Sequence, residues 1–263
     1  MRHEKRMKEF FSTIAGASFR YHDIPGKGSP LLFIHGLGCA SSCDYPQVAT
    51  APYLRGRHVI LIDLLGSGFS DRPKKFGYTT TDHARVLHEF IASMNIPKAS
   101  LYGHSMGGSI AIELASMCGN RIGSIIVSEP NLDAGGGTFS RPIAAQRETD
   151  FMRRGHSTAV SNALKQGHTI WGSSLSQSLP VALHREAVSL VMGCTPSWRE
   201  QLITLPGSRT IIFGERSLPD PDATRLHGYG VTVRIVRRAG HSMAWENPSG
   251  LARCISGSLV HIG

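Results

Sequence analysis

The chain has 263 residues, a formal net charge of +9 and 41% hydrophobic residues. This composition supports a folded core and excludes a collagen-like, a disordered or a coiled-coil protein. The apolar runs are far shorter than the ~20 residues that cross a membrane, so no membrane partner is expected. The basic residues are densest between Arg2 and Lys8, without the aromatic interleaving of a nucleic-acid surface, so no nucleic-acid partner is expected either.

Short apolar runs alternate with helical patterns along the chain. Strands are predicted, in chain order, over Ser18–Ile24, Leu31–His35, His58–Asp63, Ala99–Tyr102, Ser124–Ser128, Arg209–Phe213 and Val231–Val236. Helices are predicted over Thr81–Met94, Gly107–Cys118 and Pro248–Leu259. Strands that are apolar throughout and separated by helices indicate an α/β fold, with a mostly parallel sheet covered by helices on both faces.

The alternation of strands and helices stops between Pro130 and Pro206. That stretch has scattered apolar residues and no strong strand pattern. We therefore expect residues 131–205 to form a helical lid, inserted into a core domain made of residues 1–130 and 206–263. Apolar lid residues such as Phe139 and Trp171 are candidates both for lining a substrate pocket and for packing the lid on the sheet.

The strongest chemical signal is Gly103-His104-Ser105-Met106-Gly107, between a predicted strand and a predicted helix. A sharp turn there holds the serine in a strained conformation and exposes its hydroxyl, and the small glycines avoid a clash. Ser105 is therefore the predicted nucleophile. The backbone N–H of Met106, at the start of the helix, is a predicted donor to a developing oxyanion.

Two further strand ends complete this chemistry. His35-Gly36-Leu37-Gly38 follows a strand, and a turn there aims the N–H of Leu37 at the same oxyanion hole. Ala239-Gly240-His241 follows the last strand, and a serine needs a base near neutral pH, so His241 is the predicted general base. His104 is not expected to be the base, because neighbouring residues on such a turn point apart.

These motifs resemble the α/β-hydrolase fold superfamily over essentially the whole chain. The resemblance rests on His35–Gly38, on Asp63–Pro73 with its Asp-x-x-Gly-x-Gly-x-Ser pattern, on Gly103–Gly107 and on Gly240–His241, in that order. It implies a serine hydrolase that cleaves a carboxylic ester or a lactone through an acyl-enzyme intermediate. Amide and carbon–carbon bond hydrolysis, or a non-enzymatic small-molecule receptor, are the alternatives. Dehalogenase and epoxide-hydrolase relatives are disfavoured, because they use Asp as the nucleophile.

The acid that orients the histidine departs from the usual family pattern. Family members commonly have an Asp after the next-to-last strand, where this chain has Ser217. Glu129, which ends an earlier strand, resembles a known variant of the triad, and a Glu buried at the sheet rim needs a partner such as His241. We predict a Ser105–His241–Glu129 triad. Asp220 or Asp222, and less favourably Asp133, remain alternatives for the acid.

The remaining expectations concern cofactors, assembly and compartment. The five cysteines are odd in number, and Cys39 and Cys43 lack the second pair that a zinc site needs, so no metal is expected. No organic cofactor is implied. The partner is expected to be a small apolar ester or lactone, and the chain a monomer or a homodimer. Free cysteines and the absence of an apolar leader favour the cytoplasm.

Overall fold

A computed structural model describes residues 7–260, so most of the basic run between Arg2 and Lys8 lies outside the described residues. Within this range an eight-stranded sheet has the order β1-β2-β4-β3-β5-β6-β7-β8. The pairs from β4 to β8 are parallel, whereas β2 pairs antiparallel with β1 and with β4. The strands are β1 Lys8–Ser12, β2 Ala17–Ile24, β3 Lys27–Ile34, β4 Arg57–Ile62, β5 Ala99–His104, β6 Ile122–Ser128, β7 Ser208–Gly214 and β8 Thr232–Val236.

The predicted α/β fold, with its mostly parallel sheet, is confirmed. Each of the seven predicted strands is present, with ends that differ by a few residues. Strand β1, which pairs with β2 at the sheet edge, is not predicted by the sequence pattern. Its side chains at Lys8 and Glu9 are exposed, and a short edge strand with charged residues lacks the apolar run by which strands were identified.

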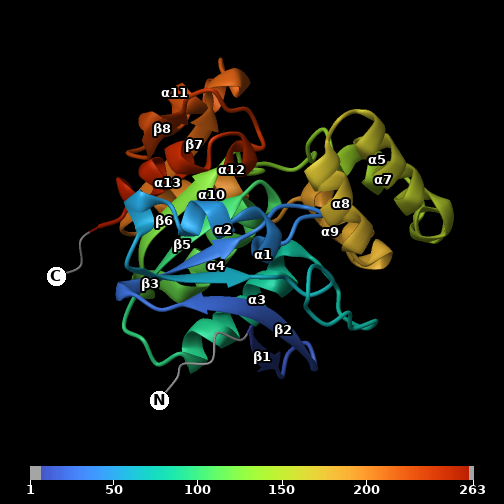
Figure 1. Ribbon diagram of the computed structural model, residues 1–263, viewed down its shortest axis with the longest axis horizontal. Coiled ribbons are helices and arrows are strands. Elements are labelled where there is room, and N and C mark those ends of the chain that lie inside the picture. Colours follow the sequence, from blue (N-terminus) through green and yellow to red (C-terminus); the bar gives the residue numbers. More distant parts are fainter. Residues whose placement is uncertain (1–6, 261–263) are drawn as a thin grey trace.

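Helices cover both faces of the sheet. Successive side chains of a strand point to opposite faces, and apolar side chains on both faces need to be covered. On β3, Leu32 and Ile34 face one apolar core, and Leu31 and Phe33 face the other. The first core includes α3 (Thr80–Ser93) and α4 (Met106–Cys118); the second includes α13 (Pro248–Ser256). Figure 1 shows α3 and α13 on different sides of the strands.

The shorter helices lie in loops between the strands. They are α1 Ser41–Asp44, α2 Pro46–Ala49, η1 Pro52–Leu54, η2 Gly119–Arg121, η4 Glu215–Ser217, α11 Pro221–His227 and α12 Met243–Glu246. The helix α3 begins at a capping box, in which Thr79 and Asp82 satisfy each other's backbone N–H groups. The helix begins one residue before the predicted start at Thr81.

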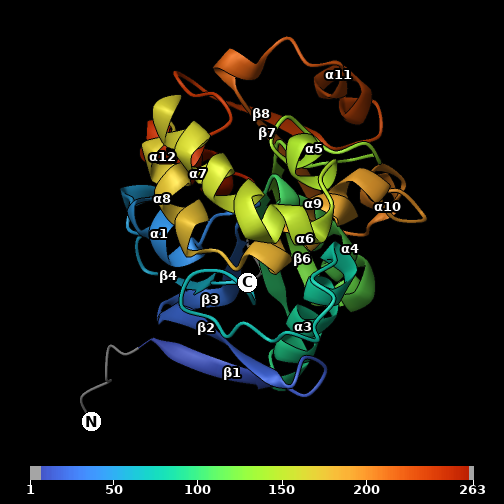
Figure 2. The same ribbon diagram turned by 90° about the vertical axis from the view of Figure 1, so that its right-hand side faces the viewer.

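Between β6 and β7 the chain is helical, as predicted, and carries no strand among residues 131–205. Its elements are α5 Ser140–Ala144, α6 Glu148–Asp150, the π-helical turn η3 Phe151–Gly155, α7 His156–Lys165, α8 Thr169–Gln177, α9 Pro180–Met192 and α10 Trp198–Thr204. Figures 1 and 2 show α5, α7, α8 and α9 grouped together beside the sheet. The last helix, α10, packs instead on α4, where Trp198 Nε1 donates to Glu113 Oε1 over 2.8 Å.

A buried polar pair joins this helical segment to the core. His83 Nε2 of α3 lies 3.1 Å from Glu186 Oε1 of α9, and each side chain is only 1% exposed. The neighbouring Thr80 N–H donates to Ser189 Oγ over 3.0 Å. These contacts fix α9 on the core. No helix among residues 7–260 combines the length and the apolar character needed to cross a membrane.

Candidate active site

Ser105 occupies the sharp turn between β5 and α4 that the sequence predicts. Its φ of 52° and ψ of −122° lie in a region that non-glycine residues rarely adopt. A Cβ atom at Gly103 would lie 2.2 Å from the carbonyl oxygen of Gly107, and one at Gly107 would lie 2.3 Å from the carbonyl oxygen of Ile34. Only glycine therefore fits on either side of the serine, which gives the Gly-x-Ser-x-Gly pattern its physical basis.

Replacing Gly107 with alanine is expected to destabilise the whole fold. The added methyl group would meet two strand-end carbonyls, those of Ile34 and His35, and backbone cannot move aside cheaply. We expect a loss of about 1–3 kcal/mol in the free energy of unfolding, measured by urea titration. Gly137→Ala is the matched control, because the nearest atom to its Cβ is 3.8 Å away. Equal stability of the two variants would contradict this steric argument.

Glu129 and His241 form a direct pair. His241 Nδ1 lies 2.7 Å from Glu129 Oε2, and the other carboxylate oxygen, Oε1, accepts the backbone N–H of Gly214 over 2.8 Å. Glu129 follows β6 with a φ of 41°, and its N–H donates to the carbonyl oxygen of Ile212 in β7. The carboxylate is thus positioned from two neighbouring strands.

Burial by itself raises the pKa of Glu129, but hydrogen bonds from His241, Gly214 and Ser217 outweigh it. The net pKa lies below the ordinary value, so the carboxylate is ionised near neutral pH. Ser217, which stands where the resembled family commonly has Asp, contributes to this lowering of the Glu129 pKa.

A lowered pKa in the folded state makes stability depend on pH. This contribution is full above the unfolded pKa of Glu129, near 4.5, and disappears as pH falls through the lower folded value. We therefore expect the stability gap between wild type and Glu129→Gln to narrow over that acidic range. Urea unfolding at several pH values between about 6 and 3 measures it. A gap that stays constant over this range would contradict the lowered pKa.

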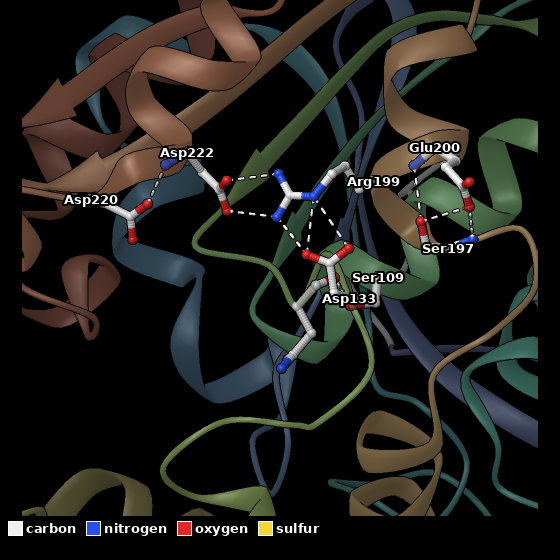
Figure 3. A network of polar contacts seen from close by, with 8 residues as sticks. Ser109, Asp133, Ser197, Arg199, Glu200, Asp220 and Asp222 are labelled. Carbon is white, nitrogen blue, oxygen red and sulfur yellow. Dashed lines mark hydrogen bonds and ion pairs between the residues drawn. The ribbon is translucent and has the colours of Figure 1, made fainter.

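The alternative acids have other partners. Asp220 caps α11, accepting the N–H of Asp222 over 2.8 Å. Arg199 of α10 binds both Asp222, at 2.7 Å and 3.0 Å, and Asp133, at 3.0 Å and 3.2 Å (Figure 3). The geometry therefore brings Glu129 to His241, and none of the three aspartates. Since Asp220 and Asp222 still line the same cavity, the choice of acid also needs a functional test.

The loop after β3 closely approaches Ser105. A Cβ atom at Gly36 would lie 3.4 Å from Ser105 Cβ, so Gly36 brings the backbone beside the serine. Met106 is the first residue of α4, so its N–H has no acceptor within the helix. Among the hydrogen bonds of residues 7–260, none uses the N–H of Leu37 or of Met106. Both groups are available as donors to a substrate oxygen.

The turn after β4 supports this loop. The Asp63 carboxylate accepts the N–H and the hydroxyl of Ser42, at 2.9 Å and 2.8 Å, and Ser70 Oγ donates to the Asp63 carbonyl oxygen over 2.6 Å. Buried His35 accepts the N–H of Leu64 at Nε2 over 3.0 Å. Asp63 and Ser70 thus stabilise the turns beside this loop.

His104 is a neighbour of His241 that the sequence analysis did not assign a role. The two ring centroids are 4.6 Å apart, and His104 Nδ1 lies 3.0 Å from Ser128 Oγ. Burial and the nearby His241 lower the pKa of His104 to about 3, so it stays neutral. The neutral ring of His104 therefore adds no positive charge next to His241. Its position next to Ser105 is the only sequence signal that could have indicated this contact.

Ser105, His241 and Glu129 line one cavity of about 640 Å³. No direct hydrogen bond joins Ser105 Oγ to His241 among the described residues, and such bonds are often long without substrate. Of the apolar lid candidates, Phe139, Trp171 and Leu190 line this cavity. Others serve as core: Phe151, Leu175, Leu183 and Trp198 are fully buried.

The Asp and Glu residues that line the cavity are not matched by any Lys or Arg in the described lining. Besides Glu129 it includes Asp44, Asp220, Asp222 and Glu246, and no Lys or Arg of residues 7–260 lines it. Some of this charge is compensated, because Asp222 pairs with Arg199 and Glu246 with Arg216. Burial raises the pKa of Asp44. No group of three or more His, Cys, Asp or Glu side chains in the described range is arranged to hold a metal ion.

Comparison with known proteins places these features in context. The model of a protein family described as "alpha/beta hydrolase fold" matches residues 29–202. A 2-hydroxy-6-oxo-6-(2'-aminophenyl)hexa-2,4-dienoic acid hydrolase from Metapseudomonas resinovorans is 32% identical over 126 residues, 47% of this chain and 43% of that protein. A proline iminopeptidase from Heyndrickxia coagulans is 33% identical over 129 residues, 48% of this chain and 44% of that protein. The matched segment thus spans less than half the length of each of these curated relatives.

Solved structures resemble the chain over nearly its full length. An esterase from Exiguobacterium antarcticum superposes with a TM-score of 0.78 at 19% identity, covering 96% of this chain and 98% of that one. At this identity the likeness concerns the fold. It confirms the expected architecture and leaves the chemistry to the residues of the site.

Proposed function

The chain belongs to the α/β-hydrolase fold family, and from this premise we propose that it is a serine hydrolase acting on a carboxylic ester or a lactone. The observation that carries the proposal is the contact of 2.7 Å between His241 Nδ1 and Glu129 Oε2. Both residues line the same cavity as Ser105. A buried carboxylate holds the imidazole in the tautomer that leaves Nε2 free to take a proton.

In the proposed mechanism, His241 Nε2 removes the proton of Ser105 as Oγ attacks the acyl carbonyl carbon. The N–H groups of Leu37 and Met106 stabilise the oxyanion, and His241 then protonates the leaving oxygen. Water, activated by the same histidine, hydrolyses the acyl-enzyme and restores Ser105. The helical segment 131–205 acts as a lid over the acyl pocket, with Phe139 and Trp171 as two of its walls.

The charge of the cavity favours an ester or a lactone over the substrates of some relatives. The printed name of the Metapseudomonas relative specifies a dienoic acid, whose carboxylate is anionic at neutral pH. A cavity lined by several carboxylates, with no Lys or Arg among the described residues, offers such a group no permanently charged counter-ion. Carbon–carbon bond hydrolysis of an acid is therefore the less favoured alternative.

The direct test combines hydrolysis with covalent labelling. Chromogenic p-nitrophenyl acetate, butyrate and octanoate are assayed with wild type and with Ser105→Ala, and a fluorophosphonate is used to label the active serine. We expect hydrolysis by wild type, with the label mapped to Ser105 by mass spectrometry, and neither in the variant. Labelling without turnover of any ester would favour the amide or carbon–carbon alternative. Absence of both would favour a receptor.

Charge selectivity gives an independent prediction. p-Nitrophenyl butyrate and the p-nitrophenyl monoester of succinic acid have acyl chains of equal carbon number, but only the second carries a carboxylate. We expect kcat/KM to be at least about tenfold higher for the neutral ester, because an unpaired anion is poorly tolerated beside carboxylates. Each rate is divided by the ester's own alkaline hydrolysis rate. Faster cleavage of the succinate would contradict this assignment.

A further inference from the structure

We infer that Trp171 is a positioning residue for the oxyanion hole, linking helix α8 to the loop that stabilises the transition state. The inference rests on the proposed function, since it assigns a role in the same reaction. Its starting point is one hydrogen bond: Trp171 Nε1 donates to the carbonyl oxygen of Leu37 over 2.9 Å. Leu37 is also the residue whose N–H faces the substrate in the proposed mechanism.

The oxyanion loop is held at both of its peptide groups. The Gly36 carbonyl oxygen, which shares a peptide group with the Leu37 N–H, lies 2.9 Å from His35 Nδ1, and the indole of Trp171 holds the next peptide group from outside the loop. Leu37 stands between Gly36 and Gly38, and glycine allows the adjoining peptide groups to rotate at little steric cost. Gly38 has a φ of +68°, and within the loop the Cys39 N–H donates to the Gly36 carbonyl oxygen over a long 3.2 Å. The indole N–H fixes the plane of the peptide after Leu37. The orientation of the N–H before it is thereby restricted.

The same helix contacts the loop directly. A Cβ atom at Gly38 would lie 2.5 Å from Leu175 Cδ1 and 3.3 Å from Trp171 Nε1, so α8 packs against the loop with no space left for a side chain. Leu175 is fully buried. Gly38 thus serves two needs, a positive φ and close approach of a helix.

Helix α8 is itself held on the core at its far end. The guanidinium of Arg72 donates to the carbonyl oxygen of Gln177 over 2.8 Å, and the N–H of Leu179 donates to the carbonyl oxygen of Gly66, also over 2.8 Å. Both core partners belong to the turn after β4. Because the helix end is anchored, the indole is presented to Leu37 from a rigid support, as preorganisation requires.

Phe139 completes the contact with the base. Its ring centroid is 4.7 Å from that of Trp171 and 6.0 Å from that of His241. The two aromatic side chains therefore lie between the oxyanion loop and the histidine. Displacement of α8 would therefore remove the indole contact with Leu37 and disturb the aromatic contacts next to His241 together.

The test removes the indole N–H while retaining the ring. Two variants are compared with wild type on p-nitrophenyl butyrate. The first is Trp171→Phe. In the second, Trp171 is replaced by β-(3-benzothienyl)alanine, which has the same shape but carries sulfur in place of the N–H. We expect kcat to fall about tenfold with KM nearly unchanged, less than the ~10²–10³ that loss of a direct oxyanion donor costs. Affinity for a boronic acid that forms a tetrahedral adduct with Ser105 should fall in parallel. Ser173→Ala is the control, because the side chain of this exposed residue on α8 donates to the Thr169 carbonyl oxygen within the same helix and makes no hydrogen bond to the loop.

The outcomes separate this inference from the proposed function. An unchanged kcat in the benzothienyl variant, with Ser105→Ala inactive, would overturn the positioning role and leave the serine mechanism intact. A rise in KM with a lower melting temperature in both variants would mean that the indole only packs the lid, which also overturns the inference. Activity retained by Ser105→Ala would remove the proposed function and this inference with it.

Discussion

Replacing Glu129 with glutamine is expected to lower kcat by about 10³–10⁴, the size of effect seen when a triad acid becomes an amide. The amide keeps the shape of the side chain and removes its charge. It can also present an N–H to His241 Nδ1, which selects the tautomer that carries its proton on Nε2. That tautomer cannot take the Ser105 proton. KM should change little, because Glu129 pairs with His241 at 2.7 Å and acts through it.

Steady-state kinetics of the matched amides decides among the candidate acids. Asp133→Asn, Asp220→Asn and Asp222→Asn should each retain kcat within a few-fold of wild type, because their carboxylates pair with Arg199 or cap α11. Circular dichroism and melting temperature confirm that each variant is folded. A loss of about 10³ in Asp220→Asn or Asp222→Asn, with Glu129→Gln active, would move the acid to the loop after β7.

The elements that the sequence predicts well are those whose cause is local. The Gly-x-Ser-x-Gly pattern of the elbow spans five residues, and Gly103 is required within them, because its Cβ would lie 2.2 Å from the Gly107 carbonyl oxygen. Gly107 is required by the neighbouring β3, where its Cβ would lie 2.3 Å from the Ile34 carbonyl oxygen. The start of α3 is encoded by a capping box spanning four residues. The prediction of Glu129 as the acid rests on two other observations. Ser217 occupies the position where the resembled family commonly has Asp, and a Glu buried at the end of a strand needs a partner. Its contact with His241 spans 112 residues, so the sequence left alternatives that only geometry narrows.

The features that the sequence did not predict depend on long-range packing. Trp171 contacts Leu37 across 134 residues, and no periodicity in either segment indicates that contact. The ring of His104 packs at a tilt against that of His241 only because the carboxyl end of β5 and the loop after β8 lie close together in the fold. β1 is defined by its pairing with β2 rather than by an apolar face. Helix content between residues 131 and 205 was predictable, but which face of α8 meets the core was not.

Replacing Ser105 with alanine is expected to lower kcat more than any other single substitution. In that background, adding Glu129→Gln should have no further effect on kcat. Ser105→Ala should lower kcat by about 10⁴–10⁶, leaving only the catalysis that the oxyanion donors and substrate binding supply. If Ser105, His241 and Glu129 act as one unit, Glu129→Gln added to Ser105→Ala should cause no further loss. Independent roles would instead give a double variant slower by the product of the two effects. Measuring the four rates on one ester, with enzyme purified free of host esterases, distinguishes a coupled triad from three residues that merely share a cavity.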